Sequence, residues 1–519
     1  MELALNSLTH GLLTLGDPMV ITFLIVGVLW GAVCGALPGV GSGLALGVVL
    51  PLTFGMDAIP AVAFLVAISI GVQFGNGIPA ILLGVPGTPG SFLTAIDGYA
   101  MTRRGKTGQA LGTMWFAGFT GQLISIPFFV LLVVPLSSIT YTFLSPELFA
   151  LYCLGLCALV SLTGESMFKG LAAAAFGVLL AMIGPDPVSA IARFDFGLRE
   201  LRPGLATVPA VLGLVTISEL IRNMRQAYDW DDLKRNGKSD ARFPGFRYLV
   251  KLTRPVVSGS LIGTLIGAIP GMSGTGAVVM AYQQAKLTSK TPEKFGRGSE
   301  EGIAANESAG NASQAGELVP TLGLGLPASD TMVLLLGALL LQGFVPGPML
   351  LQASPELLYA TVAGLLGASL VIIAIGWLVQ TVLLRLVRLD RRIVFPLAFL
   401  LTLIGVYSLR RSVFDVLVLL TCGLVGYYML RYGYSTPAAA VGLLLGAGFE
   451  SNLRQGLLLV NSDLVAFVSR PWTAAILSVC VLLLVYGVVS NISVARKVRA
   501  RSELPATAEG EIRDPQEHS

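Results

Sequence analysis

Long apolar stretches separated by short polar segments repeat along the whole chain. A helix needs about 20 predominantly apolar residues to cross a bilayer, so the pattern predicts an all-α polytopic membrane protein. We expect roughly twelve membrane segments, some of them hairpins or broken helices rather than full spans. Clear examples of the apolar stretches are 112–134, Val362–Leu384, Ile393–Tyr407, Val413–Leu430 and Trp472–Val489.

Glycine and proline recur at matching positions in two distant stretches, which predicts two repeats. Each stretch has three glycines at four-residue intervals and then a proline-glycine pair. The residues are Gly27, Gly31, Gly35 and Pro38-Gly39 in the first stretch, and Gly259, Gly263, Gly267 and Pro270-Gly271 in the second.

A second matching motif follows each of these. Its spacing is Pro-x-x-x-x-Gly-x-Pro, in Pro79 to Pro86 and again in Pro320 to Pro327. Proline and glycine break membrane helices, and the freed backbone groups are tolerated only inside protein or beside a water-filled site. Corresponding breaks in two halves of an apolar chain indicate a transporter's substrate site. The alternative is a duplicated bundle whose helices merely kink or pack closely at small residues.

Composition places most of the chain in lipid. The 519 residues are 54% hydrophobic and 12% charged, with mean hydropathy +0.77. The two histidines, His10 and His518, lie near the termini, which excludes most catalytic mechanisms that need an imidazole in the membrane. Cys153 and Cys157 are one helical turn apart, but without a nearby histidine we favour helix packing over a metal pair. We also expect no removable signal peptide.

Basic residues are grouped in loops, which the positive-inside rule assigns to the cytoplasm. The first half carries its loop after the second motif, at Arg103–Lys106, whereas the second half carries it between the motifs, at Lys286–Arg297. This displacement predicts inverted repeats, because inversion exchanges which connections are cytoplasmic. In Arg222–Arg254, interspersed aspartates favour a solvated connector over a nucleic-acid patch. We therefore divide the chain into a first repeat (1–221), a basic cytoplasmic connector (222–254), a second repeat (255–495) and a polar, disordered cytoplasmic tail (496–519).

Polar residues gather at the predicted breaks. Glycines allow close backbone approach, half-helix N-termini can face an anion, and hydroxyl and carbonyl oxygens can coordinate Na⁺. Carboxylates at membrane depth are candidates for ion coupling. For Thr88 and Ser91, capping of the next helix is the alternative. We expect no catalytic residue and no structural metal. The substrate-binding candidates are Gly39, Gly41, Ser42, Asn76, Gly77, Gly87, Thr88, Ser91, Gly271, Ser273, Asn311 and Ser329. The ion-coupling candidates, at which Na⁺ could bind, are Thr94, Asp97, Asn306, Glu307 and Asp330.

Taken together, these segments resemble the large membrane subunit of the tripartite tricarboxylate transporter family (TctA-like). The resemblance implies a cation-coupled importer of tricarboxylates such as citrate, or of other organic acids, in a bacterial inner membrane. It implies Na⁺ or H⁺ as the coupling ion, with no other cofactor. The implied partners are a small membrane subunit (TctB-like) and a periplasmic solute-binding protein (TctC-like), with no nucleic acid. The stretches that carry the resemblance are 35–41, Leu50–Met56, Ile78–Ser91, 97–99, 104–112, Gly267–Gly271, Ser289–Gly298 and 337–339. The chain departs from the family pattern at Asn76-Gly77, 306–312 and 327–330.

Two other function classes remain at this point. A channel-like anion permease without ion coupling could use the re-entrant elements as a filter. An intramembrane enzyme would need a nucleophile–base pair or paired catalytic carboxylates. Saturable, gradient-driven uptake would separate a transporter from a channel, and a hydrolysed product would favour the enzyme.

Overall fold

A computed structural model describes residues 2–37, 41–140, 142–162, 167–186, 189, 191–224, 244–270, 274–344, 350–386 and 391–485. The described chain is almost entirely helical, which confirms the predicted all-α class. One short exception is an antiparallel pair, β1 (Gly184–Pro185) and β2 (Ala192–Arg193), in which Gly184 lies opposite Arg193.

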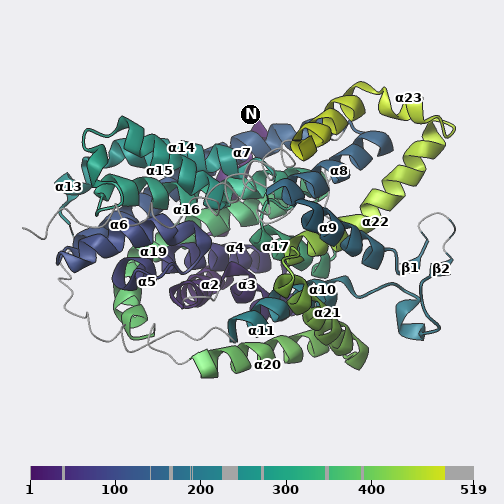
Figure 1. Ribbon diagram of the computed structural model, residues 1–519, viewed down its shortest axis with the longest axis horizontal. Coiled ribbons are helices and arrows are strands. Elements are labelled where there is room, and N and C mark those ends of the chain that lie inside the picture. The colour runs from purple at the N-terminus through teal and green to yellow at the C-terminus, as the bar shows by residue number, and fades with distance from the viewer. Residues whose placement is uncertain are drawn as a thin grey trace, which may run out of the picture.

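The elements before residue 225 form the first half of the bundle (Figure 1). They are α1 (Glu2–Thr14), α2 (Pro18–Ala36), α3 (Ser42–Val49), η1 (Leu50–Gly55), α4 (Ala58–Gly75), α5 (Gly77–Leu83), η2 (Pro89–Ser91), α6 (Phe92–Arg103), α7 (Thr107–Thr140), α8 (Ser145–Leu162), α9 (Met167–Ala181), η3 (Arg199–Leu201), α10 (Thr207–Leu212), the π-helical η4 (Gly213–Ile217) and α11 (Ser218–Met224).

The elements after residue 243 form the second half. They are α13 (Phe246–Val250), α14 (Thr253–Gly267), α15 (Gly274–Thr288), η5 (Pro292–Lys294), α16 (Glu300–Leu324), α17 (Asp330–Leu341), α18 (Leu350–Ala353), α19 (Glu356–Leu386), α20 (Arg391–Arg410), α21 (Val413–Arg431), α22 (Thr436–Leu459) and α23 (Leu464–Val468).

Five described helices are long and apolar enough to cross a membrane. Further apolar helices are shorter, including α9, α17 and the first part of α8. The predicted total of roughly twelve segments and the inverted orientation of the repeats remain predictions. The five candidate spans are Pro18–Ala36, Ala58–Leu83, Thr107–Thr140, Glu356–Ala374 and Val413–Arg431.

The two glycine triplets lie where helices pack against each other: α2 runs along α4, and α14 runs along α16. A Cβ atom added at any of the six glycines would lie 2.2–2.8 Å from a backbone carbonyl oxygen of the partner helix. Packing at small residues, the alternative interpretation, therefore describes these glycines. The acceptors are the carbonyl oxygens of Phe64, Ile68 and Val72 in α4, and of Ala305, Ala309 and Ser313 in α16.

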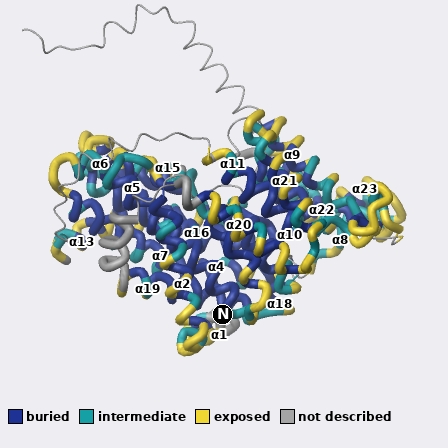
Figure 2. Tube along the Cα trace, turned by 90° about the horizontal axis from the view of Figure 1, so that it is seen from below, coloured by how far each residue is buried: buried dark blue, intermediate teal, exposed yellow. Residues whose placement is uncertain are grey.

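One long helix from each half also packs against the other half. Helix α19 of the second half packs on α2 and α4, and helix α7 of the first half packs on α14 and α16. Figure 2 shows that burial is concentrated in the middle of the molecule, where α4 and α16 lie. The two halves therefore use equivalent helix contacts and are interleaved.

Both copies of the second motif break the helical path, as predicted. Gly84 follows the last residue of α5 and Gly325 follows the last residue of α16. Each glycine is a left-handed C-cap, with φ of 68° and 72°. Beyond each cap, the N–H of Val85 donates to the carbonyl of Pro79 (3.4 Å), and that of Leu326 donates to the carbonyl of Pro320 (3.1 Å). Helix α6 begins directly after the short helical turn η2, and α17 begins after a short irregular segment. The turns of the first motif, at 38–40 and 271–273, lie outside the described residues.

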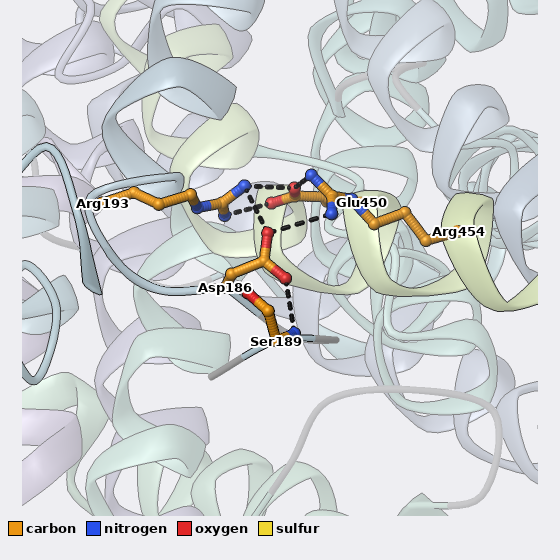
Figure 3. A network of polar contacts seen from close by, with 5 residues as sticks. All are labelled: Asp186, Ser189, Arg193, Glu450 and Arg454. Carbon is orange, nitrogen blue, oxygen red and sulfur yellow. Dashed lines mark hydrogen bonds and ion pairs between the residues drawn. The ribbon is translucent and has the colours of Figure 1, made fainter. Parts of the chain in front are cut away.

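A network of four charged residues holds the β hairpin to α22 (Figure 3). The Arg193 guanidinium donates to both carboxylate oxygens of Glu450 (2.7 and 2.8 Å) and pairs with Asp186 (3.0 Å). Arg454 pairs with the same two carboxylates, at 2.9 Å from Asp186 and 2.8 Å from Glu450. Figure 1 places the hairpin at the opposite end of the molecule from α14 and α15.

Much of the proposed connector, 225–243, and the whole proposed tail, 496–519, lie outside the described residues. The described end of the connector forms α13, and α14 begins at Thr253. The domain boundaries therefore remain predictions.

Candidate functional site

A buried polar cluster joins the two halves at the middle of α16. The hydroxyl of Thr94, in α6, donates to the carboxylate of Glu307, in α16. Asn306 Nδ2 donates to Thr94 Oγ1 at 2.7 Å, and Asn311 Nδ2 donates to the carbonyl oxygen of Glu307 at 2.9 Å. All four side chains are at most 2% exposed. The structure therefore brings together four predicted site residues from segments about two hundred positions apart in the sequence.

Several oxygens at this cluster accept no hydrogen bond from any described residue. They are Oδ1 of Asn306, Oε2 of Glu307, Oδ1 of Asn311 and, on α4's C-terminal side, Oδ1 of Asn76. A buried polar atom without a partner costs about 1–3 kcal/mol, so such a group needs an explanation. Because all four atoms are acceptors, their chemistry suits a hard cation or a proton rather than an anion.

The first break contributes a second set of neutral polar groups. Asn76, between α4 and α5, donates from Nδ2 to Thr88 Oγ1 (2.8 Å) and to Gln73 Oε1 (3.2 Å). Ser91 Oγ donates to the Thr88 carbonyl at 2.9 Å. No side-chain capping bond is found where Ser91 precedes α6, so capping by Ser91 is wrong. The segment is a tight turn held by its own polar groups.

Close backbone approaches fix this turn beside the α16 cluster. A Cβ atom at Gly87 would lie 2.6 Å from the Gly35 carbonyl and 2.8 Å from Cα of Asn76. A Cβ atom at Gly77 would lie 3.4 Å from Oε1 of Glu307. The first break and the Glu307 cluster therefore adjoin, as the predicted substrate and ion sites of a coupled transporter must.

The second break is separate and has different chemistry. Ser329 Oγ donates to Glu317 Oε2 at 2.6 Å, and the backbone N–H of Gly274, the first residue of α15, donates to Glu317 Oε1 at 3.1 Å. Asp330 is exposed in the first turn of α17 and interacts electrostatically with Glu219 of α11. No described hydrogen bond or ion pair joins Asp330 to Glu307.

Asp97 has a different set of partners from the other ion-coupling candidates. Its Oδ1 accepts the N–H groups of Gly296 (2.9 Å), Gly298 (2.8 Å) and Ser299 (2.9 Å). Its Oδ2 accepts the hydroxyl of Tyr282 at 2.7 Å. With four donors already bound, this carboxylate is a junction between α6 and the loop that precedes α16, and we leave it out of the proposed cation site.

The remaining predicted residues belong to the first motif. Gly41 precedes α3 and Ser42 begins it, and a Cβ atom at Gly41 would have no neighbour within 4 Å. Oε2 of Glu219 would lie 3.3 Å from a Cβ atom at Gly43, so a carboxylate faces the first turn of α3. Gly39, Gly271 and Ser273 lie outside the described residues.

Sequence reasoning did not select Glu317, although a signal for it was present. Asn76 and Glu317 each stand three residues before the first proline of the second motif. Extending the alignment of Pro79 with Pro320 backwards pairs these two polar residues. Gln73, which accepts from the nearby Asn76, was also missed. Tyr282 was missed because its partner, Asp97, comes from a distant segment.

Comparison with known proteins gives two kinds of match. The sequence model of the Tripartite tricarboxylate transporter TctA family matches residues 21–441. An "Uncharacterized 52.8 kDa protein in TAR-I ttuC' 3'region" of Agrobacterium vitis is 33% identical over 476 residues, which is 92% of this chain and 94% of the relative. An "Uncharacterized protein in TAR-II ttuC' 3'region" of the same organism is 33% identical over 224 residues, 43% of this chain and 93% of the relative. No solved structure matches the chain at a significant level.

Proposed function

The chain belongs to the Tripartite tricarboxylate transporter TctA family, and on this basis we propose that it imports carboxylates across a bacterial inner membrane by cation-coupled secondary transport. In this proposal a periplasmic solute-binding protein delivers the substrate, and a small membrane subunit completes the complex. The substrates are tricarboxylates such as citrate or other organic acids.

One observation carries the coupling part of the proposal: the oxygens without donors around Glu307. They are buried, they lie at the contact of α6 with α16, and they adjoin the first break. A carboxylate entering a negatively charged cell works against about 2.3 kcal/mol per charge per 100 mV. A co-transported Na⁺ or H⁺ offsets that cost, and the Glu307 cluster supplies the acceptors that either ion needs.

The first break is the proposed substrate position. Its side chains Asn76, Thr88 and Ser91 are uncharged, and α6 starts directly after it with its N-terminal backbone amides. Helix N-termini favour anions, because their first N–H groups have no intrahelical acceptor. Substrate and cation would then bind as neighbours, and each would favour binding of the other by charge attraction.

We also propose that the two repeats are inverted. The equivalent helix contacts of the two halves support the repeat itself, and the displaced basic loops support its inversion. Single cysteines at Ser42 and Ser273, in a background without the five native cysteines, test it with impermeant thiol reagents. Labelling from opposite sides of the membrane is expected. Labelling of both positions from one side alone, in every transport state, would refute inversion.

Uptake measurements test the proposed function. Cells that lack the chromosomal gene and are complemented with the wild type are expected to accumulate labelled carboxylate with saturable kinetics. Collapse of the Na⁺ and H⁺ gradients by ionophores is expected to abolish that accumulation. Undiminished uptake after both gradients collapse would contradict coupling, and non-saturable uptake would favour the channel alternative. A thermal-shift screen of the binding protein against carboxylates would identify the substrate.

A further inference from the structure

Asn76 and Glu317 occupy equivalent positions in the two halves. The third glycine of each triplet faces the backbone nitrogen of one of them. A Cβ atom at Gly35 would lie 3.0 Å from N of Asn76, and a Cβ atom at Gly267 would lie 3.3 Å from N of Glu317. Each side chain also bonds the hydroxyl that follows the second proline, Thr88 in the first half and Ser329 in the second. The two breaks are therefore built alike around these residues.

The direction of the hydrogen bond differs between the two breaks. Thr88 accepts from Asn76 Nδ2 at 2.8 Å, so its own hydroxyl hydrogen remains available to donate. Ser329 instead donates to Glu317 Oε2 at 2.6 Å. The other oxygen of Glu317 accepts the N–H of Gly274, at the start of α15. In the second half, the Ser329 hydroxyl and the Gly274 N–H therefore already donate hydrogen bonds to a carboxylate of the protein, that of Glu317.

We propose that Glu317 occupies, in the second half, the hydroxyl donor whose counterpart in the first half, on Thr88, remains free for a carboxylate group of the substrate. Glu317 is 2% exposed, and each of its carboxylate oxygens already accepts a hydrogen bond at the second break. Because Glu317 uses these local donors, they are not available to a substrate carboxylate at the second break. Glu317 is thus a specificity-determining residue. It limits how many carboxylate groups of one substrate molecule can accept hydrogen bonds from the protein. This inference rests on the proposed function.

Replacement of Glu317 tests the inference. Glu317→Gln replaces the carboxylate with a carboxamide and keeps the shape, and Glu317→Asn copies the residue of the first half. Competition by acetate, succinate and citrate against labelled uptake is measured in cells, and each half-inhibitory concentration is expressed relative to that of acetate. Both variants are expected to lower the relative value for citrate about tenfold, the effect of about 1.4 kcal/mol from one newly available site. The relative value for succinate is expected to fall less.

Two further variants make the test specific. Glu301→Gln removes a carboxylate from the first turn of the same helix and is expected to leave all relative values unchanged. Asn76→Asp places a carboxylate in the first break and is expected to raise the half-inhibitory concentrations of all three acids. This second variant keeps the idea testable if the Glu317 variants fail to reach the membrane.

The outcomes separate this inference from the proposed function. If the wild type transports carboxylates and the relative values stay the same in both Glu317 variants, Glu317 does not determine specificity, and the proposed function stands. The Glu317 variants could be absent from the membrane. In that case the inference is wrong if Asn76→Asp leaves the half-inhibitory concentrations of all three acids unchanged. If the wild type takes up no carboxylate, both proposals fall together.

Discussion

The middles of α4 and α16 pack alike but carry opposite chemistry. Each helix meets a glycine triplet through its backbone carbonyl groups, and each path ends at a left-handed glycine after a proline. When the helices are aligned on Pro79 and Pro320, the polar residues of α16 correspond to buried aliphatic residues of α4. The three pairs are Asn306 with Leu65, Glu307 with Val66 and Asn311 with Ile70.

This difference separates what the fold requires from what the site requires. The glycine contacts are needed on both sides, because the helix backbones approach too closely for a Cβ atom. The polar residues are not needed for packing, since Leu65 and Ile70 fill the equivalent positions at no more than 2% exposure. Burial of unpaired acceptors is costly. Their presence in one half alone therefore points to a function for that half.

The largest effect on steady-state accumulation is expected when α16 is made like α4 at the position of Glu307. Glu307→Val copies Val66 and removes the proposed coupling group. Steady-state accumulation is expected to fall about fortyfold for each coupled charge at 100 mV, from the work of about 2.3 kcal/mol that the charge performs. Labelled uptake in complemented cells measures it, with Glu293→Gln, an exposed carboxylate in the loop before α16, as control. Accumulation at the wild-type level would remove Glu307 from the mechanism.

The largest effect on the rate of uptake is expected when the first break is filled. Gly87→Leu is expected to abolish uptake while leaving membrane insertion intact, because even a Cβ atom there would lie 2.6 Å from the Gly35 carbonyl. Gly271→Leu, in the second half and outside the described residues, is expected to do the same. Gly55→Leu is the control, since a Cβ atom at Gly55 has no neighbour within 4 Å. Wild-type rates in both test variants would contradict a paired site.

The triplets predict equal damage in the two halves. Gly31→Ala and Gly263→Ala would each place a Cβ atom within 2.3 Å of a carbonyl oxygen. Each is expected to destabilise the protein by about 1–3 kcal/mol, the usual cost of overpacking. Thermal unfolding in detergent, followed by size exclusion, measures this. Gly276→Ala, which meets nothing within 4 Å, should not lower the unfolding temperature. If only one of these two substitutions lowers the unfolding temperature, the two halves are not packed equivalently.

A smaller loss is expected from the neutral side of the first break. Asn76→Ala removes the bond to Thr88 and is expected to lower the rate of uptake about three- to tenfold, the effect of one hydrogen bond. Asn452→Ala removes a comparable bond, to the Gly448 carbonyl in α22, and serves as control. Equal losses in the two variants would mean that the effect is structural.

The smallest effect on transport belongs to the distal ion network. Arg193→Ala removes pairs with Glu450 and Asp186 and is expected to cost roughly 1 kcal/mol of stability, since these side chains are partly exposed. The rate of uptake should change less than about twofold. A large loss of uptake with unchanged stability would show that the hairpin takes part in transport.

Local patterns predicted much of this architecture, and long-range packing accounts for the rest. Apolar runs predicted the helices, and the proline–glycine spacing predicted both breaks, because these residues act on their own backbone. The exchange of α7 and α19 between the halves was not predicted, because the sequence of an apolar helix does not indicate which helices pack against it. The partners of Asp97 were not predicted for the same reason: three of its four donors are backbone amides some two hundred positions away.

The most direct test compares net accumulation with exchange in proteoliposomes that contain the wild type or Glu307→Gln. Under an imposed Na⁺ or H⁺ gradient, only the wild type is expected to accumulate labelled carboxylate. In equilibrium exchange, which needs no net cation movement, Glu307→Gln is expected to keep a rate within about tenfold of the wild type, because it retains the side-chain shape. Gradient-driven accumulation by Glu307→Gln at the wild-type level would contradict the assignment of cation coupling to the α16 cluster.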